Sequence, residues 1–223
     1  MRKSRHASAW SGAAILLACA AGVLAQDTPT LTCGASGMPS IPQAMLRVEN
    51  ASFPELTGVD VRSRTFHSRS DFLKTGFSFV RFFLPLRMRY FVKINPEMFP
   101  RGVPEDGLCA ILAHELSHVV ELSRGMRIRR FALIRLLSKS YTARFERRTD
   151  LEAIERGYAA GLAAYRTWIY SNIPPEDLPQ KRRNYFSPEE IDVVSRRLRA
   201  QPDLAVRWRK RIPMTLDEAR GVP

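Results

Sequence analysis

The sequence predicts a predominantly helical α+β domain with a small sheet, and three stretches carry this prediction. Residues 104–124 are apolar nearly all round a helix, which is typical of a buried helix. Residues 142–170 have the pattern of one long helix, and its small side chains would let another helix pack closely. Residues 89–95 are rich in β-branched and aromatic side chains and end at an Asn95-Pro96 turn, which predicts a strand.

The size and charge of the chain limit its class. It has 223 residues, of which 45% are hydrophobic, so we expect one globular domain with a substantial core. The formal net charge of +13 favours acidic partners such as anionic lipid headgroups or nucleic acid. The alternative is an ordinary solvated basic surface.

Residues 1–25 have the pattern of a secretory signal peptide. Three basic residues precede an apolar run over 13–24, and we expect cleavage before Gln26. Lipoprotein attachment through Cys19 and an uncleaved anchor are the alternatives. The mature chain is therefore expected to be exported, periplasmic or secreted from a bacterial cell, and export argues against nucleic acid as a partner.

The segments around these stretches complete the expected organisation. Residues 26–60 are rich in Pro, Ser, Thr and Gly and predict an extended lead-in to a domain over 61–223. Residues 126–140 predict a basic amphipathic helix that either contacts an anionic membrane or packs its apolar face on the core. After two prolines end the long helix, one more helix is expected, opened by the capping box Ser187-Pro188-Glu189-Glu190.

Two cysteines, Cys33 and Cys109, follow the signal peptide. Export makes a disulfide permissible, and such a bridge would tie the N-terminal segment to the start of the buried helix. The sequence leaves open whether the two residues meet or stay unpaired.

The buried helix contains His114-Glu115-Leu116-Ser117-His118. Histidines four residues apart lie on one helix face, where two imidazole nitrogens can bind one Zn²⁺. Glu115 is rotated by about 100° around the helix axis, so its carboxylate can reach a water on the metal without binding the metal itself. The alternative is a pair of core histidines with structural partners.

A catalytic zinc site usually needs a third protein ligand. Glu121 is about 10 Å further along the axis than His114 and cannot share an ion with both histidines. We expect Glu146 as the third ligand, and Asp150, on the same helix face, as the partner of a ligand histidine's far nitrogen. Asp150 or Glu152 is the alternative ligand, and His67 is expected to be an ordinary polar residue.

These motifs resemble the gluzincin metallopeptidases, and residues 88–170 are similar to the minimal peptidase domain of the CAAX prenyl endopeptidase and HtpX-type family. The resemblance rests on the segment Leu108–Val119 around the two histidines and on the Glu146 and Asp150 pair. It implies a zincin-like metallopeptidase domain over 61–223. It also implies that the strand over 90–95 is a sheet edge where an extended substrate could pair.

The function implied is a zinc endopeptidase of the cell envelope that cleaves a protein or peptide substrate, with Glu115 as general base. Tyr158, Tyr165 and several arginines are open candidates for stabilising the oxyanion. Two other readings stay open. The protein could be a non-catalytic zinc-binding envelope protein on the same fold, or a basic membrane-peripheral protein with structural histidines.

Overall fold

The computed structural model describes residues 33–34, 37–84, 86–124 and 138–221. The expected signal peptide over 1–25 and the alternative lipid site at Cys19 lie outside these residues, as does most of the expected basic helix over 126–140. None of the helices within the described ranges is long and apolar enough to cross a membrane.

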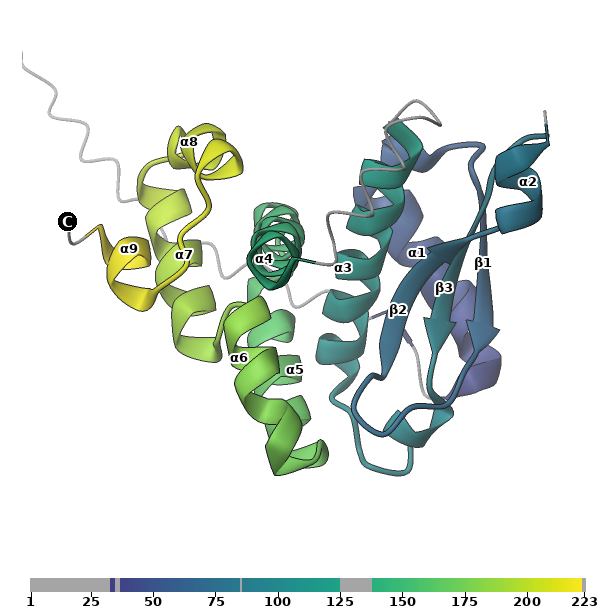
Figure 1. Cartoon of the computed structure of the whole chain (residues 1–223), viewed down its shortest axis with the longest axis horizontal. Helices are drawn as coiled ribbons and strands as arrows, with labels where there is room; N and C mark the ends of the chain where they lie inside the picture. The colour runs from purple at the N-terminus through teal and green to yellow at the C-terminus, as the bar shows by residue number, and fades with distance from the viewer. Residues whose placement is uncertain (1–32, 35–36, 85, 125–137, 222–223) are drawn as a thin grey trace, which may run out of the picture.

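The described chain is mostly helical, with one three-stranded sheet, which confirms the α+β class. In Figure 1, α3 stands between the sheet and α1 on one side and the later helices on the other. The strands are β1 (Asp60–Thr65), β2 (Leu73–Phe77) and β3 (Arg89–Ile94). The helices are α1 (Ile41–Ser52), α2 (Phe79–Phe83), α3 (Glu105–Arg124), α4 (Lys139–Glu155), α5 (Ala159–Asn172), α6 (Leu178–Asn184), α7 (Pro188–Ala200), α8 (Leu204–Lys210) and α9 (Leu216–Arg220).

The sheet has the order β1-β3-β2. β3 pairs in parallel with β1 and antiparallel with β2, so the prediction that the strand over 90–95 forms a sheet edge is wrong. Its side chains Tyr90, Val92 and Ile94 are buried in the core, and this explains why the segment is so apolar. The outer strands are β1 and β2.

The predicted lead-in over 26–60 is not extended throughout, because α1 occupies Ile41–Ser52. Ile41, Ala44, Met45 and Val48 recur at helical spacing and are buried. Pro42 stands in the first turn, where a helix tolerates proline because that turn's N–H groups have no partner within the helix. The proline that suggested a loop is therefore compatible with a helix start.

The buried helix is α3, and its observed bounds agree with the prediction. All residues from Gly107 to Val120 are buried, because the sheet and α1 cover one side of α3 and α4 and α5 cover the other.

The long helix expected over 142–170 is two helices, α4 and α5. Gly157 separates them with a φ of 93°, a left-handed conformation that favours glycine. The N–H of Tyr158 binds the carbonyl of Ala153, and that of Gly157 binds Ile154, which together form a Schellman motif. The expected close packing is present, since a Cβ on Gly161 would lie 2.3 Å from the carbonyl oxygen of Asp106 on α3.

The C-terminal part contains more helices than the one that the sequence predicted, namely α6 to α9. The predicted capping box is present at the start of α7, where Ser187 and Glu190 bond each other's backbone N–H groups. A buried ion pair joins Arg147 of α4 to Glu190 at 2.9 Å. It fixes the tail against the helix that carries the expected third ligand.

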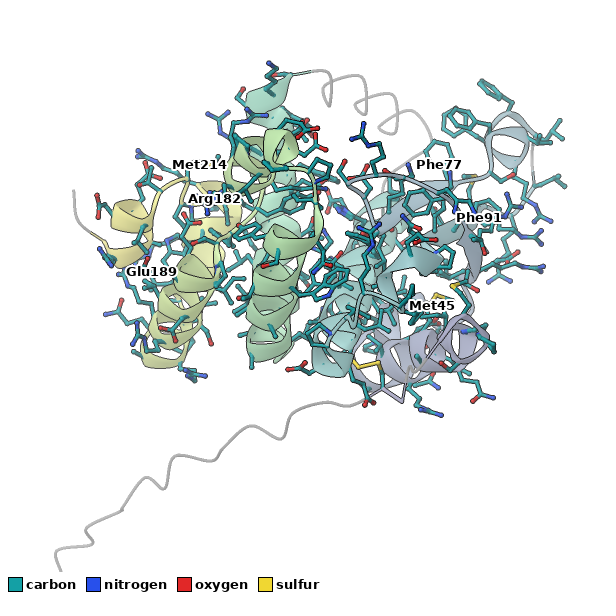
Figure 2. All side chains as sticks on the ribbon, turned by 90° about the horizontal axis from the view of Figure 1, so that it is seen from below. Met45, Phe77, Phe91, Arg182, Glu189 and Met214 are labelled. Carbon is teal, nitrogen blue, oxygen red and sulfur yellow. A yellow bond between two sulfur atoms is a disulfide. The ribbon has the colours of Figure 1, made fainter. Side chains whose placement is uncertain are left out.

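Cys33 and Cys109 form a disulfide with a Cα–Cα distance of 5.7 Å. The bond, which Figure 2 draws in yellow, ties the segment before α1 to the first turns of α3.

Candidate metal centre

The structure brings His114, His118 and Glu146 together where α3 faces α4. Oε2 of Glu146 lies 3.2 Å from Nε2 of His114 and 3.1 Å from Nε2 of His118. One donor atom from each residue lies within 4.8 Å of the other two. This group could bind a metal ion.

Both histidines are buried, and their position on α3 explains their geometry. They are one turn apart on the same helix face, with ring centroids 4.8 Å apart. Buried imidazoles cost free energy unless their nitrogens have partners, and acidic side chains supply most of those partners here.

The carboxylates and imidazoles shift each other's pKa. Burial raises the pKa of Glu146, but the charges and hydrogen bonds of His118 and His114 outweigh it, so the net pKa is well below its usual value. Burial likewise lowers the pKa of His114, yet the Asp150 and Glu146 carboxylates raise it to about 9. The negative charge of the cluster therefore favours a bound cation. In the metal-free protein that role falls to the proton on the His114 imidazole.

Asp150 lies behind His114, as the sequence predicted. Its Oδ1 is 2.8 Å from Nδ1 of His114 and 2.8 Å from Nη2 of Arg166, while its Oδ2 accepts the N–H of Phe186. Asp150 is fully buried, which raises its pKa, but the Arg166 charge and the two hydrogen-bond partners lower it below the usual value. A carboxylate held in this way orients the His114 ring.

His118 is oriented by weaker contacts. Oγ1 of Thr149 lies 3.3 Å from its Nδ1. The ring of Phe145 stacks on the imidazole at a centroid distance of 5.0 Å. The two histidines therefore have different supports, a buried carboxylate for His114 and a hydroxyl with an aromatic ring for His118.

Glu115 is buried and its carboxylate lies on the sheet side of α3. The Thr75 hydroxyl on β2 lies 2.7 Å from Oε2 of Glu115 and 2.9 Å from the Glu115 carbonyl oxygen. β2 thus holds the expected base, a contact that the sequence did not predict.

Tyr185, which follows α6, is a further residue at this site that sequence reasoning missed. Its ring centroid is 5.9 Å from that of His114, and the Arg166 guanidinium lies 4.2 Å from the ring centroid. Burial and the negative charges of Glu146, Glu115 and Asp150 raise the pKa of its phenol well above the usual value. Tyr185 therefore keeps its proton and can donate a hydrogen bond.

Other sequence candidates do not join the cluster. Both carboxylate oxygens of Glu152 contact arginines, Arg156 at 2.6 Å and Arg209 at 3.3 Å. The Tyr158 hydroxyl bonds Ser52 at 2.9 Å. Glu121 and His67 are exposed. Tyr165 is buried in the core, where burial raises its pKa.

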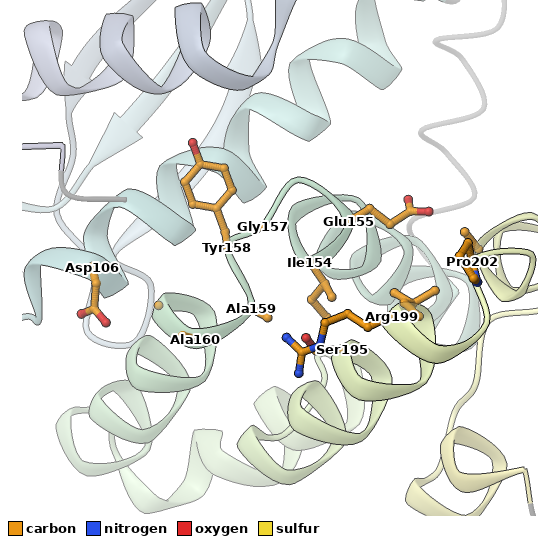
Figure 3. A pocket seen from close by; sticks show the side chains of 13 residues that line it. Asp106, Ile154, Glu155, Gly157, Tyr158, Ala159, Ala160, Ser195, Arg199 and Pro202 are labelled. Atoms are coloured by element: carbon orange, nitrogen blue, oxygen red, sulfur yellow. The ribbon is translucent and has the colours of Figure 1, made fainter. Parts of the chain in front are cut away.

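A cavity of about 460 Å³ lies away from the metal-ligand candidates, between the end of α4, the start of α5 and the helices α7 and α8. Figure 3 shows Tyr158, Ser195 and Arg199 among its lining residues. His114, His118 and Glu146 do not line it. A cavity of about 310 Å³ between α3 and α4 includes Phe145 and Thr149, which flank His118.

Comparison with models of protein families, with curated proteins and with solved structures gives no match to this chain. The resemblance to gluzincins therefore stays a prediction from the motifs, and the interpretation of the site depends on its geometry.

Proposed function

We propose that this protein is a zinc-dependent endopeptidase with a zincin-like fold, and the observation that supports this is the spacing of three donor atoms. Neighbouring ligands of a tetrahedral zinc ion are about 3.3 Å apart when each bond is about 2.0–2.1 Å. The Glu146 oxygen is 3.2 and 3.1 Å from the two histidine nitrogens. Two imidazoles and one carboxylate are a common catalytic zinc set, which leaves a fourth position for water.

Glu115 is the general base in this proposal. Zinc, when bound, polarises the scissile carbonyl and lowers the pKa of its water to about 7. Glu115 takes a proton from the attacking water and returns it to the leaving amine. Because it is rotated about 100° from His114 on α3, it does not compete for the metal, and Thr75 holds its orientation.

Tyr185 supplies the hydrogen bond to the oxyanion in this proposal, in place of Tyr158 and Tyr165. A neutral phenol near the ligands can donate to the charge that develops on the carbonyl oxygen. Tyr185→Phe should lower kcat about 100-fold, with KM and zinc content unchanged. Tyr170→Phe is the matched control, since it removes a buried tyrosine hydroxyl that has no hydrogen-bond partner and should not affect kcat. An unchanged kcat in the Tyr185 variant would remove Tyr185 from the mechanism.

The outer strand β2 is the place where an extended substrate would pair. It lies at an edge of the sheet, and its Thr75 contacts Glu115 directly. A peptide added as a further strand would run along β2 past the proposed base. This role replaces the one that the sequence predicted for β3.

We propose that the protein acts outside the cytoplasm, in the periplasm or after secretion, and that the substrate is a protein or peptide of that compartment. The Cys33–Cys109 disulfide supports this, because such bonds persist in oxidising compartments. We expect cleavage before Gln26, with lipidation at Cys19 and an uncleaved anchor as the alternatives, and mass spectrometry of the mature N-terminus distinguishes the three.

The experiment that tests the function is cleavage of a peptide library by the purified chain after chelation and after addition of one equivalent of zinc. We expect cleavage only in the zinc-loaded sample. Zinc bound tightly without cleavage would instead favour a non-catalytic zinc-binding envelope protein. No zinc binding would contradict the proposal and favour structural histidines.

A further inference from the structure

A cluster of exposed apolar side chains lies on α2 and the residues that follow it. Phe79, Val80 and Phe83 are 69%, 68% and 72% exposed, and Leu84 and Leu86 are 45% and 46% exposed. Among the described residues, the other large apolar side chains with such exposure, Leu46 and Val206, lie on other helices. We call the residues 79–84 and Leu86 the α2 tip. In Figure 1 the tip projects from the end of the sheet, away from the other helices.

Aromatic and polar contacts support the α2 tip. Phe77, at the end of β2, lies 5.1 Å from Phe79 and 5.7 Å from Phe82 between ring centroids. The Ser78 hydroxyl caps α2 by accepting the N–H of Arg81, whose guanidinium donates to the Arg87 carbonyl. Phe77 and Phe82 therefore support the short helix from inside, while Phe79, Val80 and Phe83 point outward.

The outer face of the sheet, next to this tip, is basic. Side chains alternate along a strand, so the residues that flank the core positions Tyr90, Val92 and Ile94 point away from α3. The outward positions of the three strands carry five cations and one carboxylate, which are Arg62, Arg64, Lys74, Arg89, Lys93 and Asp60.

Aromatic and cationic side chains are combined on this outer face. The Arg64 guanidinium lies 3.5 Å from the ring centroid of Phe91 and covers it. Figure 2 shows Phe91 beside many nitrogen-bearing side chains at this end of the molecule. Arg81 and Arg87 extend the positive charge of the sheet face to the α2 tip. The surface is therefore strongly positive along the sheet and apolar at the tip.

We propose that the α2 tip and the outer sheet face form a docking surface for an anionic phospholipid bilayer. The apolar side chains of the tip enter the headgroup and acyl boundary, and the strand cations contact lipid phosphates. A nucleic acid would be attracted to the same cations, and unpaired bases would stack on Phe79 and Phe83, but a nucleic acid offers no apolar phase for the aliphatic side chains Val80, Leu84 and Leu86. The exposed apolar end therefore favours a bilayer.

None of the residues of this surface belongs to the stretch over 126–140 that the sequence suggested for membrane contact. It also does not depend on the metal centre, so its test needs no peptidase activity.

The test is partition of the full chain onto sedimenting vesicles, either phosphatidylcholine alone or phosphatidylcholine with 30% phosphatidylglycerol. We expect binding to the anionic vesicles, reduced at least tenfold by Phe79→Ser with Phe83→Ser. The matched control is Leu46→Ser with Val206→Ser, which removes two exposed apolar side chains elsewhere and should leave partition unchanged. Lys74→Gln with Lys93→Gln should weaken binding to anionic vesicles only.

Direct insertion is measured with Phe83→Trp and brominated lipids, because the apolar run of residues 13–24 could itself hold the full chain on vesicles. We expect quenching in excess of that of the unsubstituted chain. Equal partition of the tip variant and no excess quenching would overturn the proposal. The face would instead be assigned to nucleic acid by three results together. The chain would bind a short RNA duplex, the lysine variant would lose this binding while the tip variant keeps it, and no excess quenching would be seen. Thermal unfolding of each variant verifies that it is folded.

Discussion

The two sides of α3 hold their buried polar side chains in different ways. Towards α4, His114 contacts two carboxylates, and Asp150 is in turn held by Arg166 and a backbone N–H. Towards the sheet, Glu115 is held by the single hydroxyl of Thr75. One helix therefore has a network of buried charges on one side and one neutral hydrogen-bond donor on the other.

Under the proposed function, this difference predicts that ion binding and proton transfer can be separated by mutation. Removal of one member from a buried charge network leaves its partners unpaired and costs several kcal/mol. Loss of one ordinary hydrogen bond costs about 1 kcal/mol. Changes on the α4 side should therefore affect the metal first, and changes on the sheet side should affect the reaction alone.

The largest effect is expected from a pair of variants, one on each side. His118→Ala should lose both zinc and peptidase activity, because two ligands remain. Glu115→Gln should lower kcat by about 10²–10⁴-fold with zinc still bound, since the amide cannot accept the proton. Metal analysis and peptide cleavage on the same samples measure both. Full activity in the Gln variant would contradict the role of Glu115 as base.

Asp150→Asn should weaken zinc binding by about 10–100-fold, because a neutral amide is a weaker acceptor for the Nδ1–H of His114 and leaves the Arg166 charge uncompensated. Competition with a chromogenic chelator measures the affinity. Thr149→Val is the matching change next to His118. It removes a neutral contact, so it should weaken zinc binding less than Asp150→Asn. The asymmetry would be refuted by equal losses in the two variants.

The metal-free protein should lose stability as the pH rises. The pKa of His114 is raised to about 9 in the folded state from 6.5, so its contribution is complete below pH 6.5 and is lost as the pH rises to 9. The loss should be on the order of 2–3 kcal/mol. Urea unfolding of chelator-treated protein at pH 6 and pH 9 tests this. His114→Gln should show a smaller difference between the two pH values.

The smallest effect is expected from Thr75→Val, which removes the hydroxyl next to Glu115. The loss in kcat should be about fivefold, with zinc affinity unchanged, because one neutral hydrogen bond is removed. Thr75→Ser should keep the activity. If Thr75→Val releases zinc, the sheet side also supports the metal. Metal binding and the reaction would then not be assigned to different sides of α3.

Features determined by local sequence could be predicted. The bounds of α3, the capping box at Ser187 and the strand over 89–95 all follow from side-chain periodicity or from a cap. The pairing of Glu146 and Asp150 with the histidines was expected because the two acids lie one turn apart on a helix. To predict this placement it was enough to assign one helix and to identify the face that both acids share.

Features that depend on tertiary contacts could not be predicted. The position of β3 in the middle of the sheet depends on β1 and β2, whose sequences are mostly polar or small. The break at Gly157 within the expected long helix could not be predicted, because nothing in the neighbouring sequence indicates a left-handed turn. Tyr185 and Arg166 reach the cluster only because α5 and α6 pack against α4, and neither has a distinguishing spacing from the histidines.

The Cys33–Cys109 bond closes a loop that contains α1, the whole sheet and the α2 tip. By the chain-entropy relation, a closure across 76 residues restricts the unfolded chain by about 4–5 kcal/mol. That restriction acts on the segment that carries Thr75 and the tip, whereas His114, His118 and Glu146 lie beyond its end. A reducing environment would thus lower the free energy of unfolding, and its effect acts through the segment that carries Thr75 and the surface proposed for lipid, while the proposed ion ligands stay outside the released loop.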